Sequence, residues 1–228
     1  MLAWATIQRD LIGYLGVLEL VQLNAWRDDR CLYTDLSVTV QAGDVLHVQG
    51  ANGAGKTTLL QQLAGLRASP KAGVRWLQKP AFSLESEYIK SLIYLGHLSG
   101  LKAALTVSEN LKIMSSLRQH ELAEAQIEQA LVNVGLYGYD ESPVQQLSAG
   151  QKRRVALARL YLEPAKLWLL DEPFSSLDKQ GVSDLEQCLI NFAAQGVMVL
   201  LTTHHPLSAR CEAKSLNLSA YAQAMGDD

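Results

Sequence analysis

The segment Gly50–Thr57 reads GANGAGKT and matches the pattern G-x-x-x-x-G-K-[ST]. It follows the short apolar run VLHVQ, which is typical of a strand, and it opens the stretch KTTLLQQLAGL, whose Leu59, Leu60 and Leu63 lie at helical spacing. A glycine-rich turn between a strand and a helix lets successive backbone N–H groups surround a phosphate, and the helix N-terminus adds positive potential there. The segment therefore predicts a strand, phosphate loop and helix at the centre of an α/β fold.

The residue types of this loop predict a nucleoside triphosphate and Mg²⁺ as ligands. Lys56 is placed to neutralise the β- and γ-phosphates, and the Thr57 hydroxyl is placed to ligate the metal ion. The predicted nucleotide-binding residues of the loop are Gly50, Asn52, Gly53, Ala54, Gly55, Lys56, Thr57 and Thr58. A chance glycine turn is the alternative, but it does not explain why the strand and the helix stand on the correct sides.

A second apolar run, LWLLDEP, ends in two carboxylates, Asp171 and Glu172. A buried strand would deliver both side chains at its exposed end. Asp171 is then a candidate magnesium ligand, together with Thr57. Glu172 is a candidate catalytic base that polarises the attacking water. An acidic strand end with no catalytic role is the alternative, and it loses weight because the phosphate loop is present.

The apolar patterns predict three regions. LWLLDEP and GVMVLLTTH are unbroken apolar runs with a helical pattern between them, as expected for a parallel sheet that is buried on both faces. LELVQLNAW and LYTDLSVTVQAG alternate apolar and polar residues, which predicts antiparallel strands. Residues 98–147 have helical spacing and no strand-like run. We therefore expect one domain, residues 17–228, with an antiparallel β subdomain and an inserted helical subdomain at 98–147. Residues 1–16 fit no pattern and are predicted to be a partly disordered N-terminal extension, which translation from an upstream start would explain.

Composition excludes several classes of protein. The chain has 228 residues and a formal net charge of −3, which gives no electrostatic reason to expect a nucleic-acid partner. Cys31, Cys188 and Cys211 are far apart and form no CxxC pattern, so they are interpreted as reduced thiols. No apolar stretch reaches the roughly eighteen residues that cross a bilayer. If the protein works at a membrane, another chain must supply the span.

The segment LSAGQKRRVALAR, Leu147–Arg159, resembles the LSGGQ signature of the ATP-binding cassette (ABC) ATPases, with Ala149 in place of the first glycine. The resemblance implies a P-loop NTPase fold with a RecA-like core and ATP as the nucleotide. It also implies a head-to-tail homodimer in which Ser148, Gly150 and Gln151 of one subunit cover the ATP held by the other. A serine-capped amphipathic helix is the alternative reading, and it explains Ser148 alone.

Further segments match landmarks of the same family. SSLD, at residues 175–178, resembles the D-loop at the subunit boundary, and LTTHH resembles the switch loop. The resemblance implies that His204 contacts the γ-phosphate, and His205 is the competing candidate. Trp26 lies near the position where the family stacks an aromatic ring on adenine. A buried core tryptophan is the other interpretation.

His97, in YLGHLSG, is at first sight a solvated loop histidine. Aligning the following LTVSENL with other ABC ATPases puts His97 at the position of the Q-loop glutamine, between the magnesium site and the groove for the membrane subunit. The resemblance therefore implies a functional histidine. A haem-ligand role for His97 or for the pair of His204 and His205 is not favoured, because nucleotide chemistry already accounts for these positions.

The strings RDDRCLY, NGAGKTTLLQQLAGL, LGH, QLSAGQKRRVALARL, LDEPFSSLD and LTTHHPL together resemble the CcmA family, the ATPases of bacterial cytochrome c maturation. The resemblance implies a CcmB-like membrane subunit with CcmC-like and CcmD-like proteins, and a place on the cytoplasmic face of the inner membrane. It also implies that ATP hydrolysis drives haem export or release of a haem-loaded chaperone. An ATPase of another ABC transporter and a non-hydrolysing nucleotide-binding scaffold are the alternatives.

Overall fold

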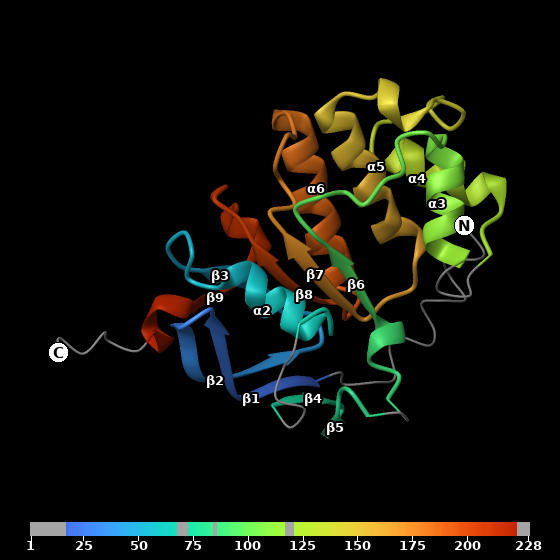
Figure 1. Ribbon diagram of the computed structural model, residues 1–228. Helices are drawn as coiled ribbons and strands as arrows, with labels where there is room; N and C mark the ends of the chain where they lie inside the picture. The colour runs from blue at the N-terminus through green and yellow to red at the C-terminus, as the bar shows by residue number, and fades with distance from the viewer. Residues whose placement is uncertain (1–16, 68–72, 84–85, 117–120, 223–228) are drawn as a thin grey trace.

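A five-stranded parallel sheet forms the centre of the chain, with helices on one side and a second, antiparallel sheet on the other (Figure 1). The computed structural model describes residues 17–67, 73–83, 86–116 and 121–222, so the predicted extension at 1–16 lies outside the described residues. In the part of the chain that is described, no helix has the length and apolar character needed to cross a membrane.

The parallel sheet brings together strands that are far apart in the sequence. In spatial order its strands are β6 (Leu92–Leu95), β7 (Leu167–Asp171), β8 (Met198–Thr202), β3 (Val45–Gln49) and β9 (Lys214–Asn217). Every neighbouring pair is parallel. The carboxyl ends of all five strands therefore lie at one edge of the sheet, where ligands of open α/β sheets bind.

Both faces of this sheet are buried, which explains its unbroken apolar runs. On β7, Leu167 and Leu169 pack toward helix α2 (Lys56–Leu63). Trp168 and Leu170 point to the opposite face and pack in a second apolar cluster with helices α5 (Ala149–Leu162) and α6 (Lys179–Ala193). The predicted fold class, a P-loop α/β fold with a mostly parallel sheet, is confirmed.

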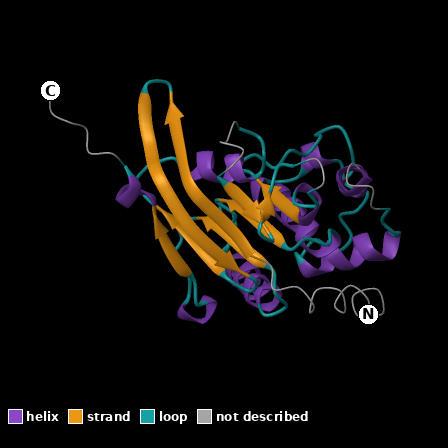
Figure 2. Cartoon of the chain, turned by 90° about the horizontal axis from the view of Figure 1, so that it is seen from below, coloured by secondary structure: helices purple, strands orange, loops and turns teal. Residues whose placement is uncertain are grey.

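The antiparallel sheet has the order β2 (Arg30–Gln41), β1 (Val17–Arg27), β4 (Val74–Trp76) and β5 (Lys79–Pro80). Figure 2 shows β1 and β2 as two long curved strands along one side of the chain. Buried side chains such as Leu36 and Val40 share one apolar cluster with Leu60 of α2. Helix α2 is thereby packed between the two sheets, and the phosphate loop that precedes it is held from both sides.

The helices lie mainly on the other face of the parallel sheet (Figure 1). Their bounds are α3 (Val107–Ser116), α4 (Glu124–Asn133), α5 (Ala149–Leu162) and α6 (Lys179–Ala193), and four short 3₁₀ turns are η1 (Ile89–Ser91), η2 (Val144–Gln146), η3 (Ala209–Cys211) and η4 (Leu218–Tyr221). Helices α3 and α4 lie within the segment 98–147. Buried Ile127 and Leu131 of α4 share an apolar cluster with Trp168 of the sheet, so the helical region packs on the common core.

Candidate active site

The phosphate loop joins β3 to α2 at the carboxyl edge of the parallel sheet. Gly55 has a φ of 97°, in the left-handed region that favours glycine. A Cβ atom at Gly55 would also lie 3.1 Å from the Tyr33 ring and 3.2 Å from Cβ of Leu32. The last glycine of the loop is therefore required both by backbone conformation and by the close approach of β2.

Lys56, the first residue of α2, folds back over the loop. Its Nζ atom donates hydrogen bonds to the carbonyl oxygens of Gly50 (2.7 Å) and Ala51 (3.3 Å). Thr57 and Thr58 follow it in the first turn of α2, whose N–H groups have no partner within the helix. The positive charge of Lys56 and the positive end of the α2 dipole therefore both lie at the phosphate loop.

A buried hydrogen-bond chain crosses from the phosphate loop to two strands. Thr57 Oγ1 donates to Asp171 Oδ2 at 2.9 Å, and Thr202 Oγ1 donates to Asp171 Oδ1 at 2.7 Å. Asp171 is 2% exposed. Both carboxylate oxygens of Asp171 are therefore satisfied, and the side chain is held facing the start of α2.

Glu172 follows with an unusual backbone conformation. Its φ is 49°, and its N–H group is directed at both the Oγ1 (3.0 Å) and the carbonyl oxygen (3.1 Å) of Thr202. Its Oε2 atom accepts from the backbone N–H of His204 at 3.3 Å, and its Oε1 atom lies 3.6 Å from Nε2 of His204. The imidazole of His205 instead packs on the Phe174 ring, 5.3 Å between centroids. Of the two competing histidines, the geometry brings His204 to the carboxylate.

These groups surround an open cleft of about 330 Å³. Its lining residues are Arg27, Leu32, Asn52, Gly53, Gly55, Lys56, Thr57, Thr58, Asp171, Glu172 and His204. Sequence reasoning missed Arg27 and Leu32, which are brought there from β1 and β2 by the packing of the two sheets. A lone arginine at a strand end carries no sequence signal for this role.

Trp26 and His97 do not line this cleft. Trp26 is 55% exposed on β1, next to Arg27, so its interpretation as a buried core residue is wrong. His97 is exposed in the loop that follows β6, the strand beside β7. Trp26 directly precedes a cleft residue in the sequence, and His97 follows the strand that pairs with β7. The stacking of Trp26 on the nucleotide and the role of His97 near the partner subunit stay predictions.

The signature segment begins α5 and does not line this cleft either. Ser148 caps the helix: its Oγ accepts from the N–H of Gln151 at 3.2 Å, and its own N–H donates to Gln151 Oε1 at 2.9 Å. A Cβ atom at Gly150 would lie 2.7 Å from the carbonyl oxygen of Ser176. Gly150 therefore allows the SSLD segment to pack directly on the signature helix.

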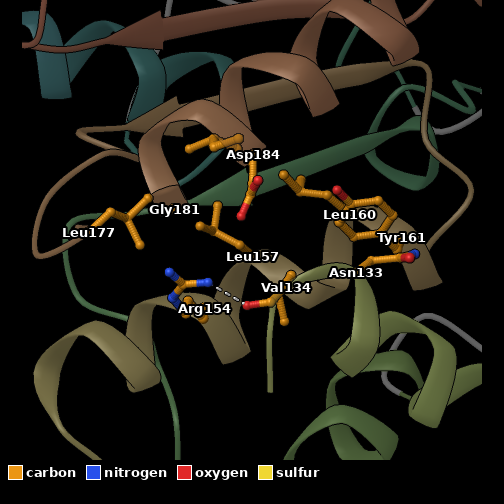
Figure 3. Close-up of a pocket in the computed structure, with 10 residues that line it drawn as sticks. Asn133, Val134, Arg154, Leu157, Leu160, Tyr161, Leu177, Gly181 and Asp184 are labelled. Carbon is orange, nitrogen blue, oxygen red and sulfur yellow. Dashed lines mark hydrogen bonds between the residues drawn. The ribbon is translucent and has the colours of Figure 1, made fainter. Parts of the chain in front are cut away.

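Behind the signature helix, Arg154 joins three helices beside a small cavity, with room for roughly one water molecule. Its Nη1 atom donates to the carbonyl oxygen of Val134 at the end of α4 (2.8 Å), as the dashed line in Figure 3 shows. Its Nη2 atom donates to Oδ1 of Asp178, the N-cap of α6, at 2.6 Å. The signature helix is thus connected both to the helical region and to the end of the SSLD segment.

The sequence matches the ABC transporter family over residues 33–175. The chain is 50% identical over 193 residues to the cytochrome c biogenesis ATP-binding export protein CcmA of Yersinia pestis, covering 85% of this chain and 88% of that protein. It is 44% identical over 210 residues to the CcmA protein of Hahella chejuensis, covering 92% and 99%. A solved ABC transporter ATP-binding protein from Pyrococcus furiosus has the same fold, with a TM-score of 0.78 and 24% identity over 90% of this chain and 99% of that chain.

The hydrogen bonds of Thr202 predict a measurable loss of stability in the variant Thr202→Val. Valine keeps the shape but leaves one oxygen of the buried Asp171 carboxylate unpaired, so the free energy of unfolding should fall by about 1.5–3 kcal/mol. Denaturant unfolding of the ligand-free protein measures this change. The matched control is Thr203→Val, whose lost hydroxyl accepts from the neutral N–H of His205 and should cost about 0.5–1.5 kcal/mol. Equal losses in the two variants would contradict the role given to Thr202.

Proposed function

Because this chain belongs to the ABC transporter family, in its CcmA branch, we propose that it is the ATP-hydrolysing subunit of a membrane complex for cytochrome c maturation. The observation that carries the ATPase part is the Glu172 carboxylate, held beside His204 at the mouth of the phosphate loop. The cytochrome c part rests on relatives of 44–50% identity that carry this name and that the chain matches over most of their length.

The phosphate groups of ATP enter at the loop. Lys56 exchanges its two carbonyl partners for the β- and γ-phosphate oxygens, and the N–H groups at the start of α2 bind the same anion. Magnesium, when bound with the nucleotide, supplies positive charge to these phosphates. Thr57 and Asp171 would hold it, because their oxygen atoms face each other at 2.9 Å and are of the type that Mg²⁺ prefers.

Glu172 acts as the general base toward the attacking water. Its side chain is about one-quarter exposed and lines the cleft, so a water molecule can reach the carboxylate. Such a base contributes roughly 10²–10⁴ to the rate. His204 lies beside it and contacts the γ-phosphate, orienting the reacting group relative to the base.

A second copy of the chain completes each site. Ser148, Gly150 and Gln151 lie at the start of α5, away from the cleft of their own subunit, and Ser148 and Gln151 keep their backbone partners within the helix cap. In a head-to-tail dimer, these residues cover the ATP that is held by the other subunit. The positive end of α5 then faces the γ-phosphate.

Two further residues connect the site to its surroundings. Trp26, exposed on β1 beside the cleft residue Arg27, stacks on the adenine ring. His97 occupies the Q-loop position, and its neighbour Leu98 is 85% exposed on the same loop. This loop faces the CcmB-like membrane subunit, which works with CcmC-like and CcmD-like proteins and holds the ATPase at the cytoplasmic face of the inner membrane.

Hydrolysis is tested with Glu172→Gln. The amide keeps the shape of the side chain but loses the base, so ATP should still bind while turnover falls by roughly 10²–10⁴. The measurement is the steady-state ATPase rate of the full chain beside ATP binding to the same preparation. A variant that hydrolyses ATP at the wild-type rate would show that the base assignment is wrong, and a variant that no longer binds ATP would contradict it as well.

The cross-subunit site is tested with mixed dimers. Ser148→Arg on one subunit and Lys56→Ala on the other leave one composite site intact and damage the other site twice. We expect one site that hydrolyses ATP in each mixed dimer, and none in dimers in which both subunits carry the same variant. Mixed dimers in which both sites are inactive, or both are active, would contradict the head-to-tail arrangement.

The role in cytochrome c maturation is tested in a bacterium whose own CcmA has been deleted. Expression of the wild-type chain should restore c-type cytochromes, measured by haem staining, and Glu172→Gln expressed at the same level should not. If the wild-type chain hydrolyses ATP but restores no c-type cytochrome, the ATPase of another ABC transporter becomes the better assignment. If both versions restore c-type cytochromes, a non-hydrolysing nucleotide-binding scaffold becomes the better assignment.

A further inference from the structure

Arg153 is a buried charge behind the active site, and it bonds entirely to main-chain oxygen atoms. It lies on α5, two residues after Gln151, and is 5% exposed. Its guanidinium donates to the carbonyl oxygens of Gly96 (3.0 Å), Asp171 (3.0 Å), Glu172 (2.7 Å) and Pro173 (3.1 Å). All four acceptors lie just beyond or at the carboxyl ends of the neighbouring parallel strands β6 and β7.

Such an arrangement needs a physical reason, because a buried guanidinium is costly to desolvate unless it is fully hydrogen-bonded. Burial lowers the pKa of Arg153, and the negative charges of Asp171 and Glu172 oppose that shift. An arginine stays protonated in proteins, so the side chain is a fixed planar array of donors. It can therefore set the directions of several carbonyl groups at once, which a side chain with a single donor cannot do.

The peptide groups around Glu172 are the ones that most need such support. A left-handed φ in a residue other than glycine costs on the order of 1–3 kcal/mol and persists only where the surroundings enforce it. Thr202 binds the N–H of Glu172, and Arg153 binds its carbonyl oxygen. The backbone of Glu172 is thus held on both sides, with the carboxylate directed to the N–H of His204.

The same guanidinium reaches the loop after β6. Its Nη1 atom binds the carbonyl oxygen of Gly96, the residue directly before His97, while Nη2 binds those of Asp171 and Glu172. One side chain of the signature helix therefore joins the loop of His97 to the backbone of Glu172. A shift of either segment relative to α5 would break these hydrogen bonds.

We propose that Arg153 is a positioning residue for ATP hydrolysis, which holds the backbone of Glu172 in its reactive conformation and ties it to the loop of His97. The inference deepens the proposed function and rests on Glu172 being the base. Arg153 does not line the cleft, and its four hydrogen bonds go to Gly96 and to residues 171–173 rather than to the phosphate loop. Its loss should therefore slow the chemical step and leave nucleotide affinity unchanged.

The test compares Arg153→Gln and Arg153→Lys with the wild type in the full chain. Displacing a reacting group by about 1 Å costs on the order of 100-fold in rate, so kcat of Arg153→Gln should fall by about 10- to 100-fold. The Kd for ATP should stay within roughly a factor of two. Lysine keeps the charge but presents one nitrogen instead of a planar fork, so Arg153→Lys should recover part of the lost kcat.

A matched control separates positioning from a general effect on the helix. Arg159, also on α5, donates to Glu163 at 2.7 Å and does not line the cleft. Arg159→Gln should lower the midpoint of thermal unfolding and leave kcat per folded protein unchanged. If Arg159→Gln lowers kcat as much as Arg153→Gln does, or if Arg153→Gln only lowers thermal stability, the proposal is overturned.

If Arg153→Gln fails to fold, the Arg153→Lys variant tests the proposal instead. A reduced kcat with an unchanged Kd for ATP supports the proposal, and a full kcat overturns it.

Glu172→Gln is measured in parallel, so that the two proposals can fail separately. If it is inactive while Arg153→Gln and Arg153→Lys keep full kcat, the positioning role is wrong and the base assignment stands. If Glu172→Gln hydrolyses ATP at the wild-type rate, the base assignment is wrong, and the positioning role falls with it.

Discussion

The buried carboxylate of Asp171 is the group on which the arrangement of the site depends. It is the last residue of a strand whose other residues are all apolar, and it is almost completely removed from water. A buried carboxylate is tolerated only where its oxygens are hydrogen-bonded. Thr57 supplies one bond from the start of α2 and Thr202 supplies another from β8, so the charge draws the phosphate loop and two strands of the sheet together.

Around this group, polar contacts at the edge of the sheet rest on the two apolar clusters that cover the sheet faces. Thr202 shares its hydroxyl between Asp171 and the N–H of Glu172, and Arg153 holds the carbonyl groups that follow. The close-packed sheet and helices supply the rigidity that these hydrogen bonds require. A conformation as unfavourable as that of Glu172 can persist because both its neighbouring peptide groups are bound.

Much of the fold could be read from local pattern. The unbroken apolar runs of β7 and β8 indicated a doubly covered parallel sheet, and the alternation along β2 indicated a strand with one buried face. The leucines of α2 had helical spacing, and that helix does end just before Gly65. The match over residues 33–175 and the CcmA relatives confirm the family that the signature segment indicated. The boundaries of the helical subdomain and the roles of the site residues stay predictions.

The sequence by itself determined the chemistry of this protein: a phosphate loop, a strand ending in two carboxylates and a signature segment, each written in consecutive residues. Only the tertiary structure decided which residues from distant parts of the chain contact these three segments. Arg27 and Leu32 reach the cleft because two sheets pack on α2, and His204 rather than His205 contacts Glu172 because of how β8 ends. Trp26 is exposed and Arg153 is buried, which is the opposite of what their residue types favour. Burial and long-range hydrogen bonds depend on how strands pair and helices pack, and no local spacing encodes those contacts.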